Sequence, residues 1–504
     1  MDRLTLTDAR MIDPPAGIAP GIAPGGAVDI EIAEGCIAEI RPAGQGTPLG
    51  RPVAAGGRLV TPGLINGHHH SHEHYHKGRY DRLPLELWMN YVRPLSPIPV
   101  SARQVYLRTM VGAIQALRSG TTTIVDDLNV SPVLIPEHVD AALQAYEDIG
   151  IRAFVGPTLF DRPFFRALPF VEEEFPPALL ARLSAVTATP PAEVLGFVRA
   201  RAVERHPREA RVAILAAPSA PQRCTDAFLC QVRAMADEID LPVIIHVQET
   251  RLQTVTAKRF YGRSMFAHLD GLGFLKPATS LIHAVWVTPE DIRLIAASGA
   301  SVQHNPNSNL KLGSGLMPMR EMLEAGVNVS LGTDGCGSID TVDMLRAVAS
   351  TALAQKLRGD DPARWIDAGE AFAAATTGGA TALGQGDRLG RIAPGMRADL
   401  ALWRLESISF VPLNDPLRQL VYGETGASLD RLIVDGRTVM AQGRLTRIDE
   451  AAILAEIGAA HEEIEPAIAA AEVEIEAMMP AYRRIVARCQ AESIDPEVLP
   501  ARLA

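Results

Sequence analysis

The sequence has few cysteines, and they lack the close, even spacing of a disulfide framework. Its 504 residues include five cysteines, and no two of them form a CxxC pair. An odd and scattered set favours reduced thiols in a cytoplasm over the disulfides of a secreted scaffold. We expect all five to be core or surface residues without a chemical role: Cys36, Cys224, Cys230, Cys336 and Cys489.

Long apolar runs are also missing. No window approaches eighteen consecutive apolar residues, and the N-terminal stretch "MDRLTLTDARMIDPPAG" has no apolar segment of the kind that a signal peptide needs. These absences predict that the protein has no membrane partner and is not exported. We therefore expect a soluble, cytoplasmic protein.

The chain has no excess of positive charge. Its 48 Lys and Arg residues are outnumbered by 59 Asp and Glu residues, which gives a formal net charge of -11. Nucleic-acid binding requires a basic surface that can displace counterions, so this composition argues against a nucleic-acid partner. With 47% apolar and 21% charged residues the chain is typical of a globular protein, and we expect a small-molecule substrate.

Short apolar runs alternate with helical segments between about residues 60 and 385. Seven runs read "TTTIVDD", "RAFVGPT", "RVAILAA", "PVIIHVQE", "TSLIHAVW", "ASVQHNP" and "NVSLGTD", and an eighth leads into Gly67. Each run continues into a polar loop, and helical segments such as "ARQVYLRTMVGAIQALRSG" end in Gly, a frequent C-cap. The pattern predicts an α/β protein with a (β/α)₈ barrel, whose active site lies at the carboxyl ends of the strands.

The two ends of the chain differ from its middle. Residues 1–60 contain runs of period-two alternation around a Gly/Pro/Ala-rich loop at residues 14–26, and short strand patterns return in residues 385–446. We expect the two ends to form one β domain, with the barrel of residues 61–384 inserted between them. Residues 447–504 are rich in Ala and Glu with helical spacing, so we expect a helical extension that packs against the barrel or a second subunit.

The stretch "HHHSHEHYH" places six of the thirteen histidines within residues 68–76. Side chains at positions i and i+2 of a strand point to the same face, so His68 and His70 can both point into the barrel mouth. Taken alone, such a pair is more typical of a polar loop than of a metal site. Three further ligand-type residues end later predicted strands and favour the metal site: His246, His283 and Asp334.

Glu249 follows His246 by three residues, where the strand is expected to give way to its loop. A divalent ion lowers the pKa of its water from about 15.7 to about 7, and a nearby carboxylate can take that proton and pass it to a leaving group. Glu249 is thus a candidate proton shuttle, with a solvated surface residue as the alternative. The fourth predicted strand, "RVAILAAPSA", has no lysine that could bridge two metals as a carbamate, so we infer one metal ion.

Several residues are candidates for substrate contacts at the barrel mouth. If the alternation continues beyond His70, then His72, His74 and His76 overhang the pocket; a solvated loop and a second, weaker metal site are the alternatives. The remaining candidates have core or surface positions as their alternatives: Trp88 and Met89 in "LELWM", Arg223 in "APQRCTD", Trp286 in "HAVW", and His304 and Asn305 in "QHNPNSN", where we expect Asn309 to be structural.

The segments "PGLINGHHH", "HVQE", "LIHAVW", "HNPNSNLKLGSG", "GTDG" and "GRIAPGMRADLALW" together resemble the amidohydrolase superfamily. They are most similar to the branch of atrazine chlorohydrolase, methylthioadenosine/S-adenosylhomocysteine deaminase and guanine and cytosine deaminases. The resemblance covers residues 1 to about 445 and implies a TIM barrel flanked by a composite β-sandwich. It also implies one metal ion held by His68, His70, His246 and Asp334, with Glu249 as proton shuttle, His283 hydrogen-bonded to the hydroxide or the attacked group, and Asp334 as a further proton acceptor.

The resemblance implies a metal-dependent hydrolytic deaminase of an N-heteroaromatic small molecule of the purine, pterin, pyrimidine or triazine type. A metal-bound hydroxide would attack the ring carbon, and ammonia would leave. The alternatives are cleavage of a cyclic amide or urea-type C–N bond, dechlorination or dealkylamination of a triazine, and an inactive barrel that serves as a binding module. A His₃Asp site suits Zn²⁺, our first choice, and also Fe²⁺, Mn²⁺ or Co²⁺. The family habit implies a homodimer or homotetramer.

Overall fold

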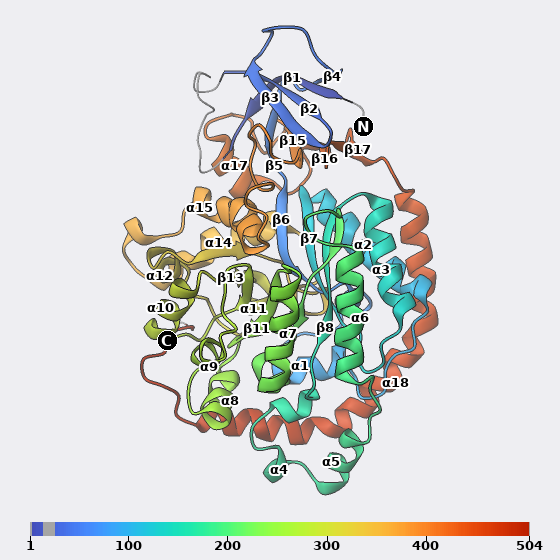
Figure 1. Ribbon diagram of the computed structural model, residues 1–504, viewed down its shortest axis with the longest axis vertical. Helices are drawn as coiled ribbons and strands as arrows, with labels where there is room; N and C mark the ends of the chain where they lie inside the picture. Colours follow the sequence, from blue (N-terminus) through green and yellow to red (C-terminus); the bar gives the residue numbers. More distant parts are fainter. Residues whose placement is uncertain (1–2, 14–25, 503–504) are drawn as a thin grey trace.

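A computed structural model describes residues 3–13 and 26–502 of the protein (Figure 1). A β domain built from both ends of the chain lies above a barrel, and a long C-terminal helix runs along the outside of the barrel. The predicted Gly/Pro/Ala-rich loop at residues 14–26 lies, except for Gly26, outside the described residues.

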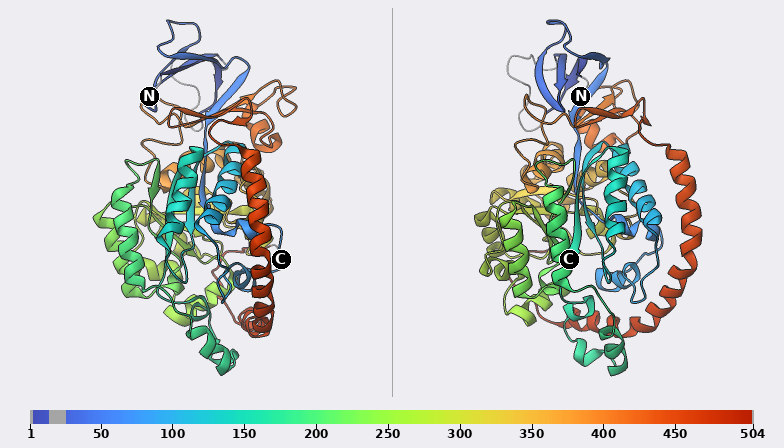
Figure 2. Two further views of the ribbon diagram at one scale, coloured as in Figure 1. Left: turned by 90° about the vertical axis from the view of Figure 1, so that its right-hand side faces the viewer. Right: turned by 45° about the vertical axis from the view of Figure 1, so that its right-hand side comes forward.

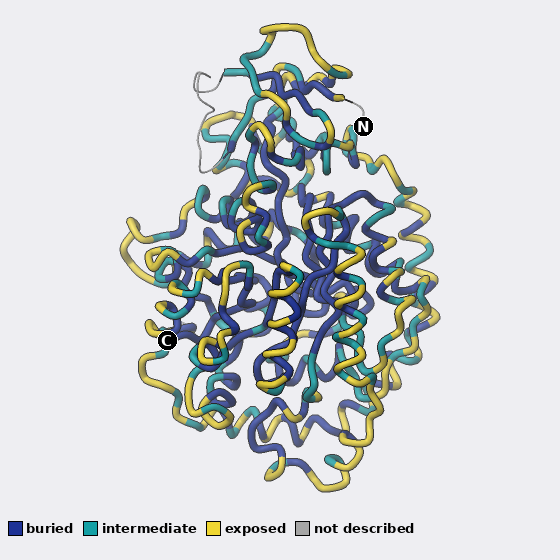
Figure 3. Tube along the Cα trace, viewed as in Figure 1, coloured by how far each residue is buried: buried dark blue, intermediate teal, exposed yellow. Residues whose placement is uncertain are grey.

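The eight predicted strand runs form the parallel barrel, as expected for alternating β and α segments. The fourth run is interrupted and gives the two short strands β9 and β10. All eight runs lie in the buried interior of the molecule (Figure 3). The barrel strands are β6 (Leu64–His69), β7 (Thr121–Leu128), β8 (Arg152–Leu159), β9 (Val212–Ile214), β10 (Ala217–Pro218), β11 (Val243–Val247), β12 (Thr279–His283), β13 (Ser301–His304) and β14 (Asn328–Leu331).

Backbone hydrogen bonds close the barrel at two seams. The amide of Ile244 donates to Ala216 O at 3.0 Å and so joins the fourth run to β11, and the amide of Asp334 donates to His68 O at 3.0 Å beyond the ends of β14 and β6. The interior is crossed by the side chain of Gln303. A Cβ on Gly67 would lie 2.2 Å from Gln303 Oε1, so this strand position requires glycine.

Several of the helices around the barrel begin at side-chain caps encoded in the sequence. At the start of α2 (Ala102–Arg118), Ser101 Oγ accepts from the amide of Gln104, and Gln104 Oε1 accepts from the amide of Ser101. The covering helices are α3 (Pro136–Ile149), α6 (Pro191–Glu204), α7 (Asp226–Glu238), α8 (Arg251–Tyr261), α9 (Met265–Gly271), α10 (Pro289–Ser298), α11 (Pro306–Lys311), α12 (Met319–Glu324), α14 (Met344–Ala354) and α15 (Ala368–Ala373).

The β domain combines strands from both chain ends, as predicted. Strand β1 belongs to two sheets, pairing with β2 and β4 in one and with β5 in the other, and β5 in turn pairs with β15 from the C-terminal part. An apolar core that includes Leu6, Ile30 and Leu402 fills the space between them. The strands are β1 (Leu4–Met11), β2 (Val28–Ala33), β3 (Cys36–Pro42), β4 (Arg51–Ala54), β5 (Arg58–Pro62), β15 (Leu400–Arg404), β16 (Leu429–Val434), β17 (Arg437–Ala441) and β18 (Arg444–Leu445).

The C-terminal extension is one curved helix, α18 (Glu450–Ala491), which wraps the barrel from the β domain to the opposite end (Figure 2). Its buried residues Ile475, Met479 and Tyr482 join an apolar cluster that includes residues of α1 (Leu85–Val92). The extension therefore packs against the barrel, one of the two expected arrangements. The domain limits at residues 60, 384 and 446 remain a proposal, and β5 runs two residues past the first of them.

None of the described helices is both long enough and apolar enough to cross a membrane.

A buried ion pair joins the barrel to the β domain. Arg152, at the start of β8, donates through Nε to Asp399 Oδ2 at 2.9 Å and through a terminal nitrogen to Asp435 Oδ1 at 3.1 Å, and its side chain is 6% exposed. Removing one partner of a buried pair leaves an uncompensated charge, which is strongly destabilising.

We expect Arg152→Met to lower the free energy of unfolding by about 3–5 kcal/mol, because Asp399 would stay buried without a cation, whereas Asp435 would keep Arg397. The midpoint of urea denaturation measures the loss. The control is Arg208→Met, which removes a solvent-exposed pair with Asp387 and should cost less than about 1 kcal/mol. Equal midpoints for the two variants would contradict the expectation.

Candidate active site

Four predicted ligands converge at the carboxyl ends of β6, β11 and β14. The Nε2 atoms of His68 and His70 lie 3.7 and 3.5 Å from Asp334 Oδ1. The ring of His246 lies 4.8 Å from that of His68 and stacks on that of His70 at 5.6 Å. One potential ligand atom from each of His68, His70 and His246 lies within 4.8 Å of the others. The spacing is that of a candidate metal site.

The histidine rings are held as neutral metal ligands require. The Nδ1 atoms of His70 and His246 lie 2.8 and 2.9 Å from the carbonyl oxygens of Asp127 and Ser219. A carbonyl only accepts, so each Nδ1 carries the proton and each Nε2 keeps its lone pair for the cluster. Both ring nitrogens of His68 are buried without a hydrogen-bond partner.

At His70 burial lowers the pKa but is outweighed by the charges of Glu73, Asp127 and Asp334, which raise it. At His68 and His246 burial dominates and keeps the imidazoles uncharged. It lowers the pKa of His68 well below its usual value and that of His246 to about 3. Buried nitrogens with free lone pairs beside a carboxylate are costly unless a cation binds them, so the residues fit a divalent metal ion.

Asp334 is ionised and firmly placed. Its Oδ2 accepts from Ser308 Oγ and its Oδ1 from the amide of Gly335, both at 2.7 Å. Burial raises the pKa of this carboxyl, but His70 and His283 outweigh burial and hold it below its usual value. Asp334 and His283 both have positive φ, 69° and 77°, which is strained for residues other than glycine and is concentrated at functional sites.

Glu249 and His283 form a second pair beside the cluster. Glu249 Oε2 lies 3.4 Å from His283 Nε2, which is 4.0 Å from Asp334 Oδ2. His283 Nδ1 lies 2.9 Å from the amide oxygen of Asn309, so Nδ1 carries the proton and Nε2 accepts. Burial, with repulsion from Asp334, raises the pKa of Glu249 well above its usual value, so the carboxyl can hold a proton at neutral pH.

The chain beyond His70 does not continue the strand alternation, because residues Ser71–His76 form the 3₁₀ helix η1. With three residues per turn, His72 and His74 point in different directions. His72 lines a cavity, whereas His74 turns into the protein, with Nε2 3.4 Å from Cys336 Sγ. The prediction of a substrate contact by His74 therefore disagrees with its position.

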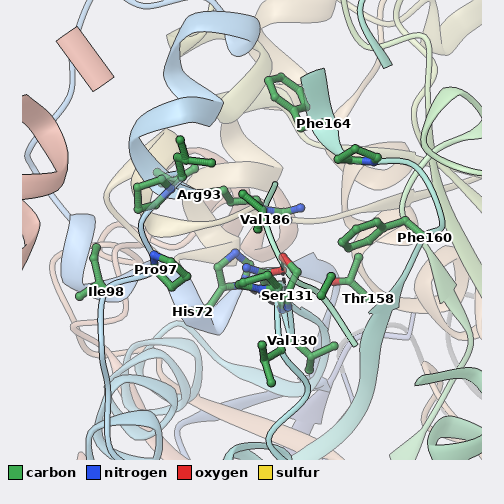
Figure 4. A pocket seen from close by; sticks show the side chains of 18 of the residues that line it. His72, Arg93, Pro97, Ile98, Val130, Ser131, Thr158, Phe160, Phe164 and Val186 are labelled. Atoms are coloured by element: carbon green, nitrogen blue, oxygen red, sulfur yellow. Dashed lines mark hydrogen bonds between the residues drawn. The ribbon is translucent and has the colours of Figure 1, made fainter. Parts of the chain in front are cut away.

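Two adjoining cavities open at the barrel mouth. The inner cavity, of about 70 Å³, is lined by His70, His246, Glu249, His283 and Asp334 and also by Trp88, Met89 and Arg223. The outer cavity, of about 1070 Å³, is lined mainly by the loops after β6, β7 and β8 and by α18; Figure 4 shows Arg93, Phe160, Phe164 and His72 around it.

The remaining predicted substrate contacts do not all reach these cavities. Trp88 lines the inner cavity, and its Nε1 donates to Gly337 O at 2.9 Å. Trp286 lines neither cavity, because its Nε1 donates to Ser314 O and its ring packs near Ala501. His304 is fully buried and lines neither cavity. Asn305 touches the site indirectly, with Nδ2 3.4 Å from His283 Nδ1.

The sequence did not reveal Arg93, Glu73 or Ser308. Ser308 orients Asp334, and Arg93 lines both cavities. Glu73, within the histidine run, lines the inner cavity and accepts from the amide of Gly337. Its position between histidines was a usable signal, whereas Arg93 follows a helix with no motif around it.

Comparisons with known proteins agree with this architecture. The model of the amidohydrolase family matches residues 59–439. A 5-methylthioadenosine/S-adenosylhomocysteine deaminase of Desulforudis audaxviator is 34% identical over 84% of this chain and 92% of its own length, and a 5'-deoxyadenosine deaminase of Methanothermobacter thermautotrophicus is 32% identical over 80% and 87%.

Solved structures agree as well. A zinc-bound adenosine deaminase from Xanthomonas campestris superposes with a TM-score of 0.80 at 28% identity, covering 92% of this chain and 98% of that one. Atrazine chlorohydrolase TrzN from Arthrobacter aurescens, also solved with zinc, gives 0.80 at 24% identity over 91% and 100%, which supports the fold alone.

Fold and comparisons together define a TIM-barrel hydrolase with a divalent-metal site. The chain belongs to the amidohydrolase family. The predictions of family, of the barrel with a composite β domain, and of a hydrolase acting on carbon–nitrogen bonds are confirmed. Helix α18 lies beyond the residues that the family model matches.

We expect one divalent metal ion per chain after reconstitution with Zn²⁺, measured by elemental analysis. His68→Ala should weaken zinc binding by at least about 10- to 100-fold, the loss seen when even outer groups of a metal site are removed. His461→Gln, on α18 and away from the cluster, is the matched control and should keep full occupancy. Full occupancy in His68→Ala would contradict this expectation.

Proposed function

We propose that the protein is a hydrolytic deaminase of an aminopurine-type ring, which it converts with water into the oxo compound and ammonia. The relatives named above as deaminases of methylthioadenosine and deoxyadenosine support this ring class. The observation that carries the proposal is the buried pair of Glu249 and His283 beside the histidine cluster, with 3.4 Å between Oε2 and Nε2.

The metal would be held by His68, His70, His246 and Asp334, with Zn²⁺ as the proposed ion. When bound there, it would supply Lewis acidity and bring the pKa of a water molecule close to about 7. The lone pairs of the three Nε2 atoms and the ionised Asp334 carboxylate match this role. Asp334 would also accept a proton from the attacking water, since its Oδ2 lies 4.0 Å from His283 Nε2 at the edge of the cluster.

Glu249 would move the proton. Its carboxyl is buried, accepts from Ser314 Oγ at 3.1 Å and has a raised pKa, so it can take a proton from water and return it to nitrogen. The departing amine needs one proton to leave as ammonia, and the attacking water supplies two: one goes to the amine and the other to the ring nitrogen of the oxo product. A group that both accepts and donates is therefore required near the amine.

His283 would orient the reacting atoms. Asn309 fixes its ring through Nδ1, and its Nε2 faces both Glu249 and Asp334. In that tautomer Nε2 can accept a hydrogen bond from water and hold it toward the ring carbon. Burial lowers the pKa of His283 to about 4, which keeps Nε2 free to accept at neutral pH.

Further parts of the prediction belong to the same proposal. We propose that His72, Trp88 and Arg223 contact the substrate, since His72 lines the outer cavity, Trp88 the inner cavity and Arg223 both. A cytoplasmic location and assembly as a homodimer or homotetramer stay predictions.

We expect Glu249→Gln to lower kcat for ammonia release by about 10²- to 10⁴-fold, because glutamine keeps the shape but carries no transferable proton. Release from aminopurine nucleosides is compared with release from amino-pterins, pyrimidines and triazines, using metal-quantified protein. The control Glu193→Gln, an exposed position on α6, should be unaffected.

If none of the ring amines releases ammonia at full metal occupancy, the proposed deaminase activity is refuted. Mass spectrometry of a cyclic-amide, urea and chlorotriazine panel would then test the predicted alternatives.

A further inference from the structure

Three arginines line the outer cavity without a carboxylate partner. Among the described residues, no Asp or Glu oxygen forms an ion pair within 4.0 Å of Arg93, Arg108 or Arg223, and the Nε atoms of Arg93 and Arg108 are buried without a hydrogen-bond partner. The buried Arg152, by contrast, has two carboxylates. A buried cation is costly unless an anion pairs with it, so the unpaired set calls for an anion from outside.

Arg223 is fixed in place and keeps donors free. Its Nε donates to Arg162 O at 3.0 Å, and its guanidinium stacks over the ring of Phe160 at 4.2 Å. The side chain is buried, and no hydrogen bond within the described protein uses its terminal nitrogens. A guanidinium held flat with one edge unused is preorganised for a carboxylate or phosphate.

Three carboxylates around Arg93 and Arg223 accept hydrogen bonds from other groups. Glu73 accepts from the amide of Gly337 at 3.0 Å, Asp127 Oδ1 from Thr158 Oγ1 at 2.6 Å, and Asp161 from the amide of Thr225 at 2.7 Å. None of the three is free to rotate toward a guanidinium without losing its own donor. No carboxylate of the described chain therefore forms an ion pair with Arg93 or Arg223.

Arg93 and Arg223 lie where the two cavities meet. Both line the inner cavity, which holds Glu249 and His283, and both line the outer cavity. Figure 4 shows Arg93 and Phe160, on which Arg223 stacks, on different sides of the outer cavity. A ring that reacts in the inner cavity could therefore place a substituent between the two arginines.

We propose that the substrate carries an anionic group, a carboxylate or a phosphate, which Arg93 and Arg223 bind at the junction of the two cavities. This rests on the proposed function and narrows its substrate class to acidic derivatives of the aminopurine ring. The outer cavity, with about 1070 Å³ and apolar walls such as Ile464, Ile468 and Val130, has room for the rest of the substituent.

His72 supports this assignment over a second metal site. Its Nδ1 accepts from the amide of Asn129 at 3.3 Å, so Nε2 carries the proton of the neutral ring. A protonated nitrogen cannot ligate a metal without losing that proton. His72 Nε2 is buried without a hydrogen-bond partner, 3.9 Å from Glu73 Oε1, and in this tautomer it is a donor and not a metal ligand.

The test compares adenosine, adenosine 5'-monophosphate, adenosine 5'-carboxylic acid and 5'-amino-5'-deoxyadenosine as substrates of the zinc-loaded enzyme. We expect kcat/KM to be about 10- to 100-fold higher for one of the two anions than for adenosine, and lowest for the cation. The anion that is preferred distinguishes phosphate from carboxylate. In Arg223→Met and in Arg93→Met the ratio of anion to adenosine should fall by at least tenfold, mainly through KM.

Using both Arg223→Met and Arg93→Met guards against a result that is caused by misfolding. Arg93 is only half-buried and makes no side-chain hydrogen bond in the described structure, so its replacement should leave the fold intact. The matched control is Arg166→Met, at the edge of the same cavity but paired with Glu172, which should keep the ratio of the wild type. Equal kcat/KM for the neutral and anionic substrates, or ratios that the Arg93 and Arg223 variants do not change, would overturn the proposal and leave the deaminase intact.

Binding separates this failure from failure of the proposed function. Calorimetric titration of the zinc-loaded Glu249→Gln protein with adenosine 5'-monophosphate, adenosine 5'-carboxylic acid, adenosine and inorganic phosphate needs no turnover. One outcome is that no ring amine releases ammonia, but an anion binds at least tenfold more weakly once Arg223→Met is added. That outcome supports the anion site and refutes the proposed deaminase activity. No preference for any anion in either measurement refutes the anion site.

Discussion

Burial of the histidine cluster is the constraint on which the rest of the structure depends. Closing the barrel brings the ends of β6, β11 and β14 to one place and removes water from the imidazoles of His68, His70 and His246. Without water, the protonated forms of His68 and His246 are disfavoured, and each unpaired ring nitrogen needs a partner. Backbone carbonyl oxygens are the partners of Nδ1 in His70 and His246, and a divalent ion is a suitable partner for the Nε2 atoms.

Desolvation has opposite effects on the two kinds of group at the barrel mouth. It keeps His283 neutral and raises the pKa of Glu249 well above its usual value, so an acceptor nitrogen lies 3.4 Å from a carboxyl that can take up and release a proton. It also leaves Arg93 and Arg223 as cations without counterions in the cavity wall. The same exclusion of water thus prepares both the reacting centre and the group that would select a substrate.

Much of the site could be predicted from the sequence because strand geometry is local. Two-residue alternation fixed the common direction of His68 and His70, and the barrel rule placed His246, His283 and Asp334 at one edge. The 3₁₀ turn that separates His72 from His74 has no such signature. The placement of Arg93 and Arg223 in the walls of the same two cavities, and the hydrogen bond from Trp286 to Ser314, depend on how distant loops fold, and no spacing in the sequence encodes that.

Helix α18 contributes Ile464, Ile468, Met478 and Tyr482 to the outer cavity, although it lies outside the part of the chain that the family model matches. A molecule bound there touches the barrel and the helix at once, so its binding energy is added to the docking energy of the helix. Ligand occupancy and amide exchange along α18 are therefore linked, and substitutions on a single helical face can evolve new selectivity while the catalytic barrel stays untouched.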